Sequence, residues 1–295
     1  MVTIHGALRP TEIITALALP SDQIGLAPTD FRSGVRVLTG PERVPVEAKV
    51  ESTGSGRRVV FLHGLVGLND HWEDVVRSIR HRAACEMLEV PLLSLRGDDC
   101  TIHAVTEMTI QYLESRPMEP STLVGNSFGG HVALRVALER PDLVSSLVLA
   151  GASGLLERTM VREVQIRPSR DWLAEKIGEL FHDRSKMREA DLDRAHQELS
   201  VRGGARAMVR LSRTARRNHL GPRISQIACP TLLIWGRQDI VTPPEAAEEF
   251  HAKIPDSRLV WLEQCGHAPM IECPAEFASA MCDFFDELER REQRP

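Results

Sequence analysis

The pattern of apolar and polar residues alternates between two periods along most of the chain. Runs rich in Val, Ile and Leu, such as RRVVFLHG (57–64) and VSSLVLAGA (144–152), are typical of buried strands. Between them lie segments such as DHWEDVVRSIRHR (70–82), whose apolar residues recur at helical spacing. Two further strand-like runs, VRVL (35–38) and VPVEAKVES (44–52), precede this alternation. The order predicts an α/β fold with a mostly parallel central sheet flanked by helices.

The same alternation continues toward the C-terminus. Further strands are expected at EMLEVPLLSL (86–95), STLVGNS (121–127), PTLLIWG (230–236) and SRLVWLEQ (257–264). Further helices are expected at HAVTEMTIQYLES (103–115), HVALRVALERP (131–141), PPEAAEEFHAKI (243–254) and PAEFASAMCDFFDELERRE (274–292).

One long segment interrupts the alternation. Residues 153–223 show helical patterns only, which predicts a helical cap inserted between the sixth and seventh strands. The core is then formed by residues 35–152 and 224–295, and a cap would lie over the carboxyl ends of the strands, where open α/β sheets bind ligands. Residues 1–34 lack periodicity and contain several prolines, which indicates a loose N-terminal extension.

A serine stands where a strand meets a helix in STLVGNSFGGHVAL (121–134). On so sharp a turn, side chains two residues before and two after Ser127 would collide with neighbouring backbone, and Gly125 and Gly129 remove the collision. The turn lifts the hydroxyl above the sheet edge, beside the first amides of the helix. This context favours a nucleophile over a purely structural turn, with the Phe128 N–H as one donor to an oxyanion.

A serine nucleophile needs a base, which is itself oriented by an acid. On this kind of sheet the acid and then the base follow the serine along the chain. Asp239 and His267 each follow a late strand, so we predict a triad of Ser127, Asp239 and His267. Two alternatives stay open: Asp239 as a turn or helix-capping residue, and His251, which lies inside a helical segment and is expected at the surface.

The second oxyanion donor should come from the loop after RRVVFLHG. Gly64 lets the chain turn there, so that the N–H of Leu65 points at the site. His63 is expected to brace this loop rather than to do chemistry, because the triad already has its base. Asn69 and Asp70 resemble an N-cap for the next helix.

Composition excludes several classes of protein. The chain has 295 residues, 42% of them hydrophobic, and a formal net charge of −5, so it can bury a large core and lacks the positive surface that nucleic acids require. The six cysteines form no CxxC pair, so no zinc or redox motif is indicated and we expect them to be reduced. No signal peptide and no apolar stretch of membrane-spanning length is recognisable, so a cytoplasmic location is expected.

The predicted cap differs from the rest of the chain in charge. Residues 152–223 contain sixteen Lys and Arg against ten Asp and Glu, and no acidic residue lies between Glu198 and Asp239. One helix would carry a stripe formed by Arg202, Arg206, Arg210, Arg213 and Arg217. The stripe either faces solvent and the acidic core, or contributes one or two arginines that hold a substrate carboxylate or phosphate.

Four ordered motifs together resemble the serine-dependent α/β-hydrolase superfamily over residues 35–290. They are HGLVG (63–67), GNSFGG (125–130), WGRQDIVTPP (235–244) and CGHAPMIECP (265–274). The resemblance implies an α/β-hydrolase fold, a cap that shapes an acyl pocket, a small-molecule substrate, and no cofactor or metal. It also gives Asn126, within the GNSFGG elbow, a supporting role beside Ser127.

Within that superfamily, GNSFGG is similar to the GNSMGG elbow of hydrolases that cleave carbon–carbon bonds of ring-cleavage products. Those enzymes commonly carry an aromatic residue after the catalytic histidine, where this chain has Ala268. Ser127 stands where haloalkane dehalogenases carry aspartate, which disfavours that activity. The leading hypothesis is a carboxylic-ester hydrolase. The alternatives are a carbon–carbon hydrolase, a cofactor-free haloperoxidase-like perhydrolase, and a non-catalytic binding protein of the same fold.

Overall fold

The computed structural model of the chain describes residues 31–116, 119–157 and 168–293. Most of the expected N-terminal extension therefore lies outside the described residues. The first strand begins at Arg32, three residues before the expected VRVL run.

The described residues form an eight-stranded sheet in the order β1-β2-β4-β3-β5-β6-β7-β8. The strands are β1 (Arg32–Thr39), β2 (Pro45–Thr53), β3 (Arg57–Leu62), β4 (Ala83–Glu89), β5 (Ser121–Asn126), β6 (Val144–Ala150), β7 (Thr231–Gly236) and β8 (Ser257–Leu262). Strand β2 pairs antiparallel with β1 and with β4, and every other pairing in the sheet is parallel. The predicted mostly parallel α/β sheet is confirmed.

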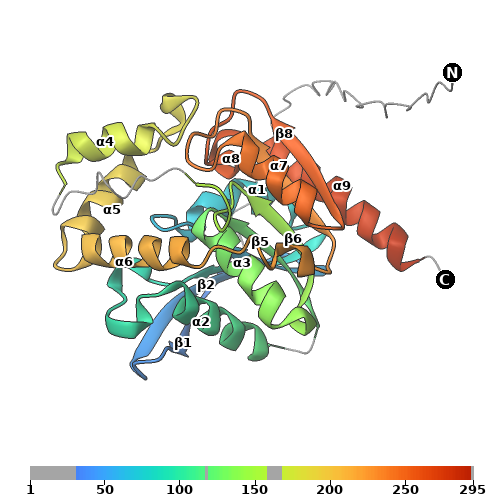
Figure 1. Cartoon of the computed structure of the whole chain (residues 1–295), viewed down its shortest axis with the longest axis horizontal. Coiled ribbons are helices and arrows are strands. Elements are labelled where there is room, and N and C mark those ends of the chain that lie inside the picture. The colour runs from blue at the N-terminus through green and yellow to red at the C-terminus, as the bar shows by residue number, and fades with distance from the viewer. Residues whose placement is uncertain (1–30, 117–118, 158–167, 294–295) are drawn as a thin grey trace, which may run out of the picture. The chain divides into compact units, whose positions relative to one another are not determined.

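Helices connect these strands and cover both faces of the sheet (Figure 1). They are α1 (Glu73–Ile79), α2 (Ile102–Glu114), α3 (Phe128–Glu139), α4 (Arg170–Gly178), α5 (Glu189–Ser200), α6 (Gly204–Arg217), α7 (Pro244–Lys253), α8 (Pro269–Glu272) and α9 (Pro274–Glu292), with 3₁₀ turns that include η1 (Asn69–Trp72), η2 (Leu92–Ser94) and η3 (Gly97–Asp99). Helices α4, α5 and α6 lie between β6 and β7, as expected from the helical segment.

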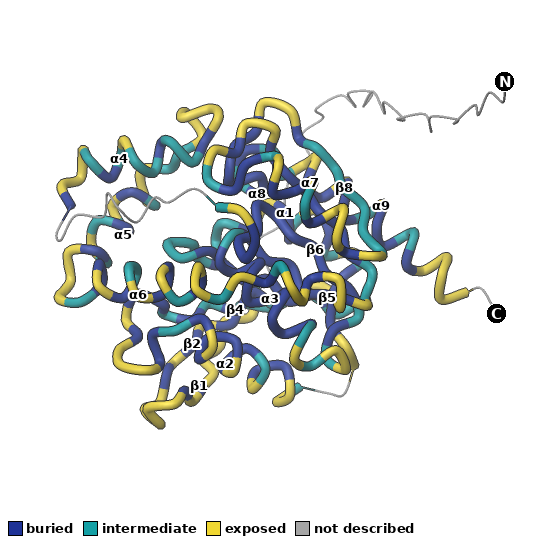
Figure 2. The backbone as a smooth tube through the Cα atoms, in the orientation of Figure 1, coloured by how far each residue is buried: buried dark blue, intermediate teal, exposed yellow. Residues whose placement is uncertain are grey.

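The alternation of side chains along the central strands builds two apolar cores, one on each face of the sheet. In β3, Val60 and Leu62 join the core beneath α2 and α3, whereas Val59 and Phe61 join the core beneath α1 and α9. Both faces of these strands are therefore buried, and Figure 2 shows the dark tube of the buried strands behind the helices. This explains why the strands read as continuous apolar runs rather than alternating ones.

One expected strand ends early. The run EMLEVPLLSL was expected to be extended throughout, but β4 ends at Glu89 and Leu92 begins the 3₁₀ turn η2. Pro91, directly before this turn, has no N–H with which to continue the ladder. The leucines after it are still buried, and they support the loop that leads to η3.

No helix in the described part of the chain is long and apolar enough to cross a lipid bilayer.

A histidine within the core gives the stability of the protein a pH dependence. His131 of α3 is fully buried, and this burial lowers its pKa to about 3. In the unfolded chain this histidine is protonated below about pH 6.5, whereas in the folded chain it stays unprotonated until a much lower pH. Above pH 6.5 neither form is protonated, so His131 does not reduce the free energy of unfolding there. Between pH 6.5 and 3 it should cost up to about 1.4 kcal/mol per pH unit.

Urea unfolding at pH 7.0 and pH 5.5 checks this expectation. The His131→Leu variant should lose less stability than the original chain over the same pH interval, because it lacks the imidazole that is protonated only in the unfolded chain. The same loss in both proteins would show that His131 is not responsible.

Candidate active site

The turn between β5 and α3 holds Ser127 in a strained backbone conformation. Its φ of 52° and ψ of −116° are disfavoured for any residue with a side chain, at a cost of about 1–3 kcal/mol. The Ser127 N–H donates to the carbonyl of Ala150 (3.1 Å), and the Ser127 carbonyl accepts from the amides of His131 and Ser153. These bonds hold the serine at the carboxyl end of β5, at the base of α3.

The two glycines around the serine are required by close backbone contacts. A Cβ at Gly125 would lie 2.5 Å from the carbonyl oxygen of Gly129, and a Cβ at Gly129 would lie 2.3 Å from that of Leu62. Both distances are far below normal contact, so no side chain fits at either position. The collision expected from the sequence is confirmed.

Asp239 and His267 meet in the loops that follow β7 and β8. Asp239 Oδ2 lies 2.8 Å from His267 Nδ1, and both side chains are buried. The carboxylate also accepts from the amides of Val241 and Thr242 and from the Thr242 hydroxyl. With Asp239 Oδ2 as acceptor, Nδ1 of His267 is the donor of this bond, and Nε2 is left to face the cavity side of the ring.

Asp239 therefore shapes its own turn and also orients the histidine. It does not cap α7, because that helix starts at Pro243 and Pro244 without a side-chain cap. His251 is exposed on α7 and its ring lies 2.9 Å from the Ser257 hydroxyl, in agreement with the surface position expected for it.

Ser127 and His267 border one cavity of about 270 Å³. The side-chain amide of Asn126 donates to the carbonyls of Ala150 (3.0 Å) and His267 (3.1 Å), so the serine turn and the histidine loop are tied together. In the described residues the Ser127 hydroxyl makes no hydrogen bond, to His267 or to any other group.

The loop after β3 forms another wall of this cavity. A Cβ at Gly64 would lie 3.5 Å from the Cβ of Ser127, so the loop passes close to the serine, and Leu65 borders the cavity. His63 is buried between the carbonyls of Gly64 (Nδ1, 2.8 Å) and Val90 (Nε2, 3.2 Å). Burial lowers the pKa of His63, and both of its ring nitrogens contact backbone carbonyls, as suits a bracing residue. Phe128 is the first residue of α3, so its N–H has no acceptor within the helix.

The inserted helices and the residues that join α4 to α5 together supply most of the apolar lining. Their contributions to the cavity include Trp172, Leu173 and Ile177 from α4, Ala195 and Leu199 from α5, and Met208 from α6. A cavity with these walls suits an aliphatic or aryl group beside the serine.

The arginine stripe does not reach this cavity. Among the described residues, none of its five members borders the cavity, whereas Arg216, which lies outside the stripe, does. Met208, Ser212 and Arg216 are four residues apart and share the face of α6 that looks into the cavity. Arg216 Nε lies 3.8 Å from Glu157 Oε1, and burial raises the pKa of that glutamate. Sequence spacing alone could not show which face of α6 docks inward.

The expected N-cap at Asn69 and Asp70 is wrong. Leu68 occupies the cap position, the side-chain Nδ2 of Asn69 donates to the carbonyl of Met87, and Asp70 pairs with Arg188 and Arg194 near α5. The two ion pairs of Asp70 thus link the core to the inserted helices.

Within the described residues, Asp70, His71 and Asp191 have side-chain ligand atoms close enough together to share a metal ion. Asp70 and Asp191 are both already paired with Arg188 and Arg194. These guanidinium groups supply the positive charge at that place, so the cluster is better described as an ion-pair network.

Gly151, which the sequence analysis did not single out, lies against the Asp239–His267 pair. It has a φ of +51°, and a Cβ there would lie 3.0 Å from both Asp239 Oδ2 and His267 Nδ1. We expect Gly151→Ala to displace the imidazole and to lower kcat by about 10²-fold. Gly178→Ala is the matched control, because a Cβ in that helix meets its nearest neighbour at an ordinary 3.5 Å. Equal kcat values for the two variants would contradict the assigned role of Gly151.

Comparisons with known proteins concern the family and the fold of the chain. The profile of the alpha/beta hydrolase family matches residues 59–280. A pimeloyl-[acyl-carrier protein] methyl ester esterase of Nitrosomonas europaea is 28% identical over 254 residues, covering 78% of this chain and 96% of that protein. A 2-hydroxy-6-oxo-6-(2'-aminophenyl)hexa-2,4-dienoic acid hydrolase of Metapseudomonas resinovorans is 27% identical over 256 residues, covering 81% of this chain and 87% of that protein.

Among solved structures, a serine hydrolase involved in carbazole degradation superposes with a TM-score of 0.74 at 23% identity, covering 86% of this chain and 99% of that one. This likeness concerns the fold, and the family profile spans most of the sheet together with the serine, aspartate and histidine loops. The chain therefore belongs to the alpha/beta hydrolase family.

Proposed function

We propose that the protein is a carboxylic-ester hydrolase that forms an acyl-enzyme on Ser127. The observation that carries this proposal is the buried Asp239–His267 pair, whose histidine borders the same cavity as a serine on a strained strand-to-helix turn. A strained turn of this kind is costly, and such strain is found where a side chain must be presented to a substrate.

The proposed reaction has two halves. His267 Nε2 takes the Ser127 proton as the serine oxygen attacks the ester carbonyl, and the amides of Leu65 and Phe128 bind the oxyanion. The protonated imidazole then gives its proton to the departing alcohol, which leaves an acyl group on Ser127. Water, deprotonated by the same nitrogen, attacks the acyl group and releases the carboxylic acid and the free serine. Asp239 keeps the imidazole oriented and stabilises its charged form.

The inserted helices act, in this proposal, as a cap over the reacting atoms. The apolar side chains of α4, α5 and α6 would hold the acyl group, and the proposed substrate is accordingly a small molecule with an aliphatic or aryl acyl part. The predicted division into a core and a cap at residues 153–223 would follow from this role.

Two related reactions compete for the same serine. The esterase named above supports ester cleavage, and the hexadienoic acid hydrolase supports cleavage of a carbon–carbon bond. Ala268 next to the histidine is small and borders the cavity, which favours the ester. Initial rates on a panel of short acyl esters and of vinylogous diketo acids separate the two. Higher kcat/KM on the esters supports the proposal, and higher kcat/KM on the diketo acids replaces it with carbon–carbon cleavage.

Two cationic side chains border the cavity, Lys176, which pairs with Glu179 at 3.0 Å, and Arg216, which a substrate carboxylate could use. A charge-assisted hydrogen bond contributes about 1.5–3 kcal/mol, and Arg216 is held only loosely, at 3.8 Å, by Glu157. We expect Arg216→Gln to lower kcat/KM for esters that carry a free carboxylate by about tenfold, relative to neutral esters of the same length. Arg213→Gln, on the same helix but away from the cavity, serves as the control. An unchanged ratio in the Arg216 variant would exclude this arginine from substrate selection.

A further inference from the structure

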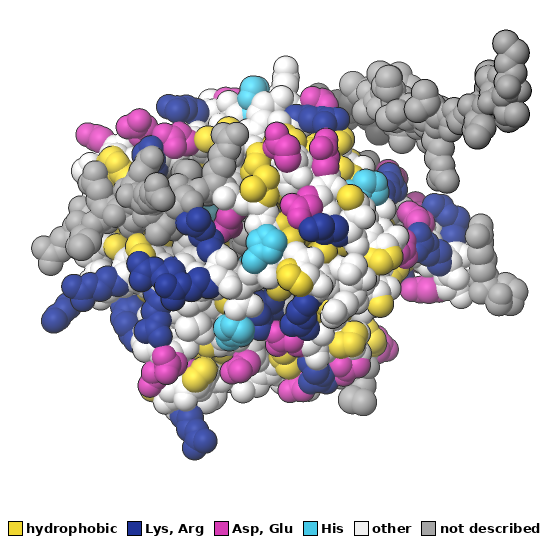
Figure 3. Space-filling model, in the orientation of Figure 1, with side chains coloured by type: hydrophobic (Ala, Val, Ile, Leu, Met, Phe, Trp, Pro, Cys, Tyr) yellow, Lys and Arg dark blue, Asp and Glu magenta, His cyan; other side chains and the backbone are white. Residues whose placement is uncertain are grey.

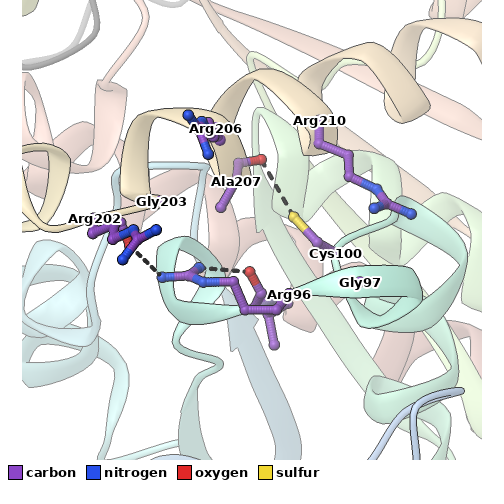
Figure 4. A pocket seen from close by; sticks show the side chains of 9 residues that line it. Arg96, Gly97, Cys100, Arg202, Gly203, Arg206, Ala207 and Arg210 are labelled. Atoms are coloured by element: carbon purple, nitrogen blue, oxygen red, sulfur yellow. Dashed lines mark hydrogen bonds between the residues drawn. The ribbon is translucent and has the colours of Figure 1, made fainter.

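A second cavity, of about 350 Å³, lies on the other side of α6 from the candidate active site. Its walls come from the first half of α6 and from the loop that joins η2 to η3 in the core. Four arginines line it, and Figure 4 shows Arg206 and Arg210 on α6, Arg202 just before this helix begins, and Arg96 on the loop opposite. Lys and Arg side chains also gather over α6 in the space-filling view of Figure 3.

The positive charge of this cavity is largely uncompensated. Arg210 pairs with Asp98 at 2.8 Å. Within the described ranges, no carboxylate lies within 4.0 Å of the guanidinium groups of Arg96, Arg202 or Arg206. Like charges gathered around one cavity repel one another, and a bound anion relieves that repulsion.

One of these arginines is held in place by the fold. Arg96 donates from Nη1 to the carbonyls of Leu93 (2.9 Å) and Leu95 (2.7 Å), and from Nη2 to the carbonyl of Arg202 (3.2 Å). Gly203 has a φ of +100°, and a Cβ there would lie 3.0 Å from Arg96 Cζ. The absence of a side chain at Gly203 therefore allows the guanidinium group of Arg96 to pack against the start of α6. Its Nε–H and one Nη2 hydrogen make no bond within the described residues, so they are available to a ligand.

The two walls of the cavity are also joined to each other. The Cys100 thiol donates to the carbonyl of Ala207 (3.4 Å), and the Ile102 amide donates to the Thr214 hydroxyl (3.1 Å). These contacts fix α6 above the loop, so the backbone positions that carry the arginines are set before any ligand arrives. Arg96, whose guanidinium group is also held, can bind an anion at lower entropic cost than a free surface side chain does.

We propose that this cavity binds the phosphate group of a small phosphorylated molecule. A phosphate monoester carries up to two negative charges and three free oxygens, so it can accept from several guanidinium groups at once and suits a group of arginines better than a singly charged carboxylate does. In the described residues no aromatic side chain lines the cavity, so it offers no stacking surface for a nucleobase. The ligand is therefore a compact phosphate or diphosphate ester without a base, bound apart from Ser127.

Titration calorimetry with sodium diphosphate and with glycerol phosphate, at an ionic strength held constant with sodium chloride, tests this inference. Arg206→Ala removes a guanidinium group from the cavity, and Arg213→Ala removes an exposed one from the same helix outside it. We expect saturable binding to the original chain, a Kd at least tenfold higher for Arg206→Ala, and a Kd within about twofold for Arg213→Ala. Binding should persist in Ser127→Ala, which separates this site from the proposed hydrolase activity.

Three results would overturn the inference. One is the absence of saturable heat with both phosphates. Another is equal weakening by Arg206→Ala and Arg213→Ala, which would indicate diffuse attraction to a basic face of the kind an acidic protein partner would use. The third is competition between diphosphate and an ester substrate for the Ser127 cavity, which would place the anion there.

Discussion

Replacing Ser127 by alanine is expected to reduce kcat for acyl esters by about 10⁵–10⁶-fold while leaving the free energy of unfolding almost unchanged. The hydroxyl supplies the attacking oxygen, and no other group in the proposed mechanism can replace it. Alanine keeps the Cβ, so the strain at φ 52° is the same. Within the described residues the hydroxyl makes no hydrogen bond, so its removal leaves no partner unsatisfied.

Steady-state kinetics on the best ester of the panel, with urea unfolding of the same samples, measures both quantities. Ser212→Ala is the control, because Ser212 also borders the cavity but lies on α6, away from the Asp239–His267 pair. It should keep kcat within about tenfold. A Ser127 variant with activity close to that of the control would show that the nucleophile lies elsewhere.

Replacing Asp239 by asparagine is expected to lower kcat by about 10⁴-fold. The asparagine amide would donate toward His267 Nδ1 and move the ring proton to Nε2, the nitrogen that must accept the serine proton. Stability should fall as well, because the carboxylate accepts from two backbone amides and the Thr242 hydroxyl. One of these donors would face the asparagine amide without an acceptor.

Asp256→Asn provides the matched control for this charge change, since Asp256 is an exposed carboxylate that pairs with Arg291 near the start of β8. Its kcat should stay within a few-fold of the original value. If Asp239→Asn retained more than about a tenth of the original kcat, Asp239 would not be orienting the histidine.

The sequence predicted the sheet and the serine turn well because both depend on local patterns. Buried parallel strands appear in the sequence as apolar runs of about six residues. The GNSFGG turn requires glycines because a side chain at Gly125 or Gly129 would collide with nearby backbone atoms. Asp239 and His267 were predictable for a different reason: each follows a strand whose carboxyl end must lie at the same edge of the sheet.

The remaining features depend on packing between distant segments. Gly151 is far from Asp239 in sequence, and only the close approach of β6 to the Asp239 loop shows why glycine is needed there. The Thr242 hydroxyl donates to the Asp239 carboxylate from within the same turn. The sequence TPP (242–244) is also common at the start of a helix, so it did not indicate this contact. On α6 the arginine periodicity was visible, yet the face that docks inward depends on tertiary contacts.

Covalent labelling with a fluorophosphonate, followed by intact mass and peptide mass spectrometry, tests most directly whether Ser127 is a nucleophile activated by His267. The oxygen of an activated serine attacks the phosphorus of this reagent and displaces fluoride, so that a phosphonyl group stays bound to the serine oxygen. We expect one adduct per chain, on the peptide that contains Ser127, with labelling slowed at least a hundredfold in His267→Ala. A folded protein that stays unlabelled, or one labelled equally fast without His267, would contradict this expectation.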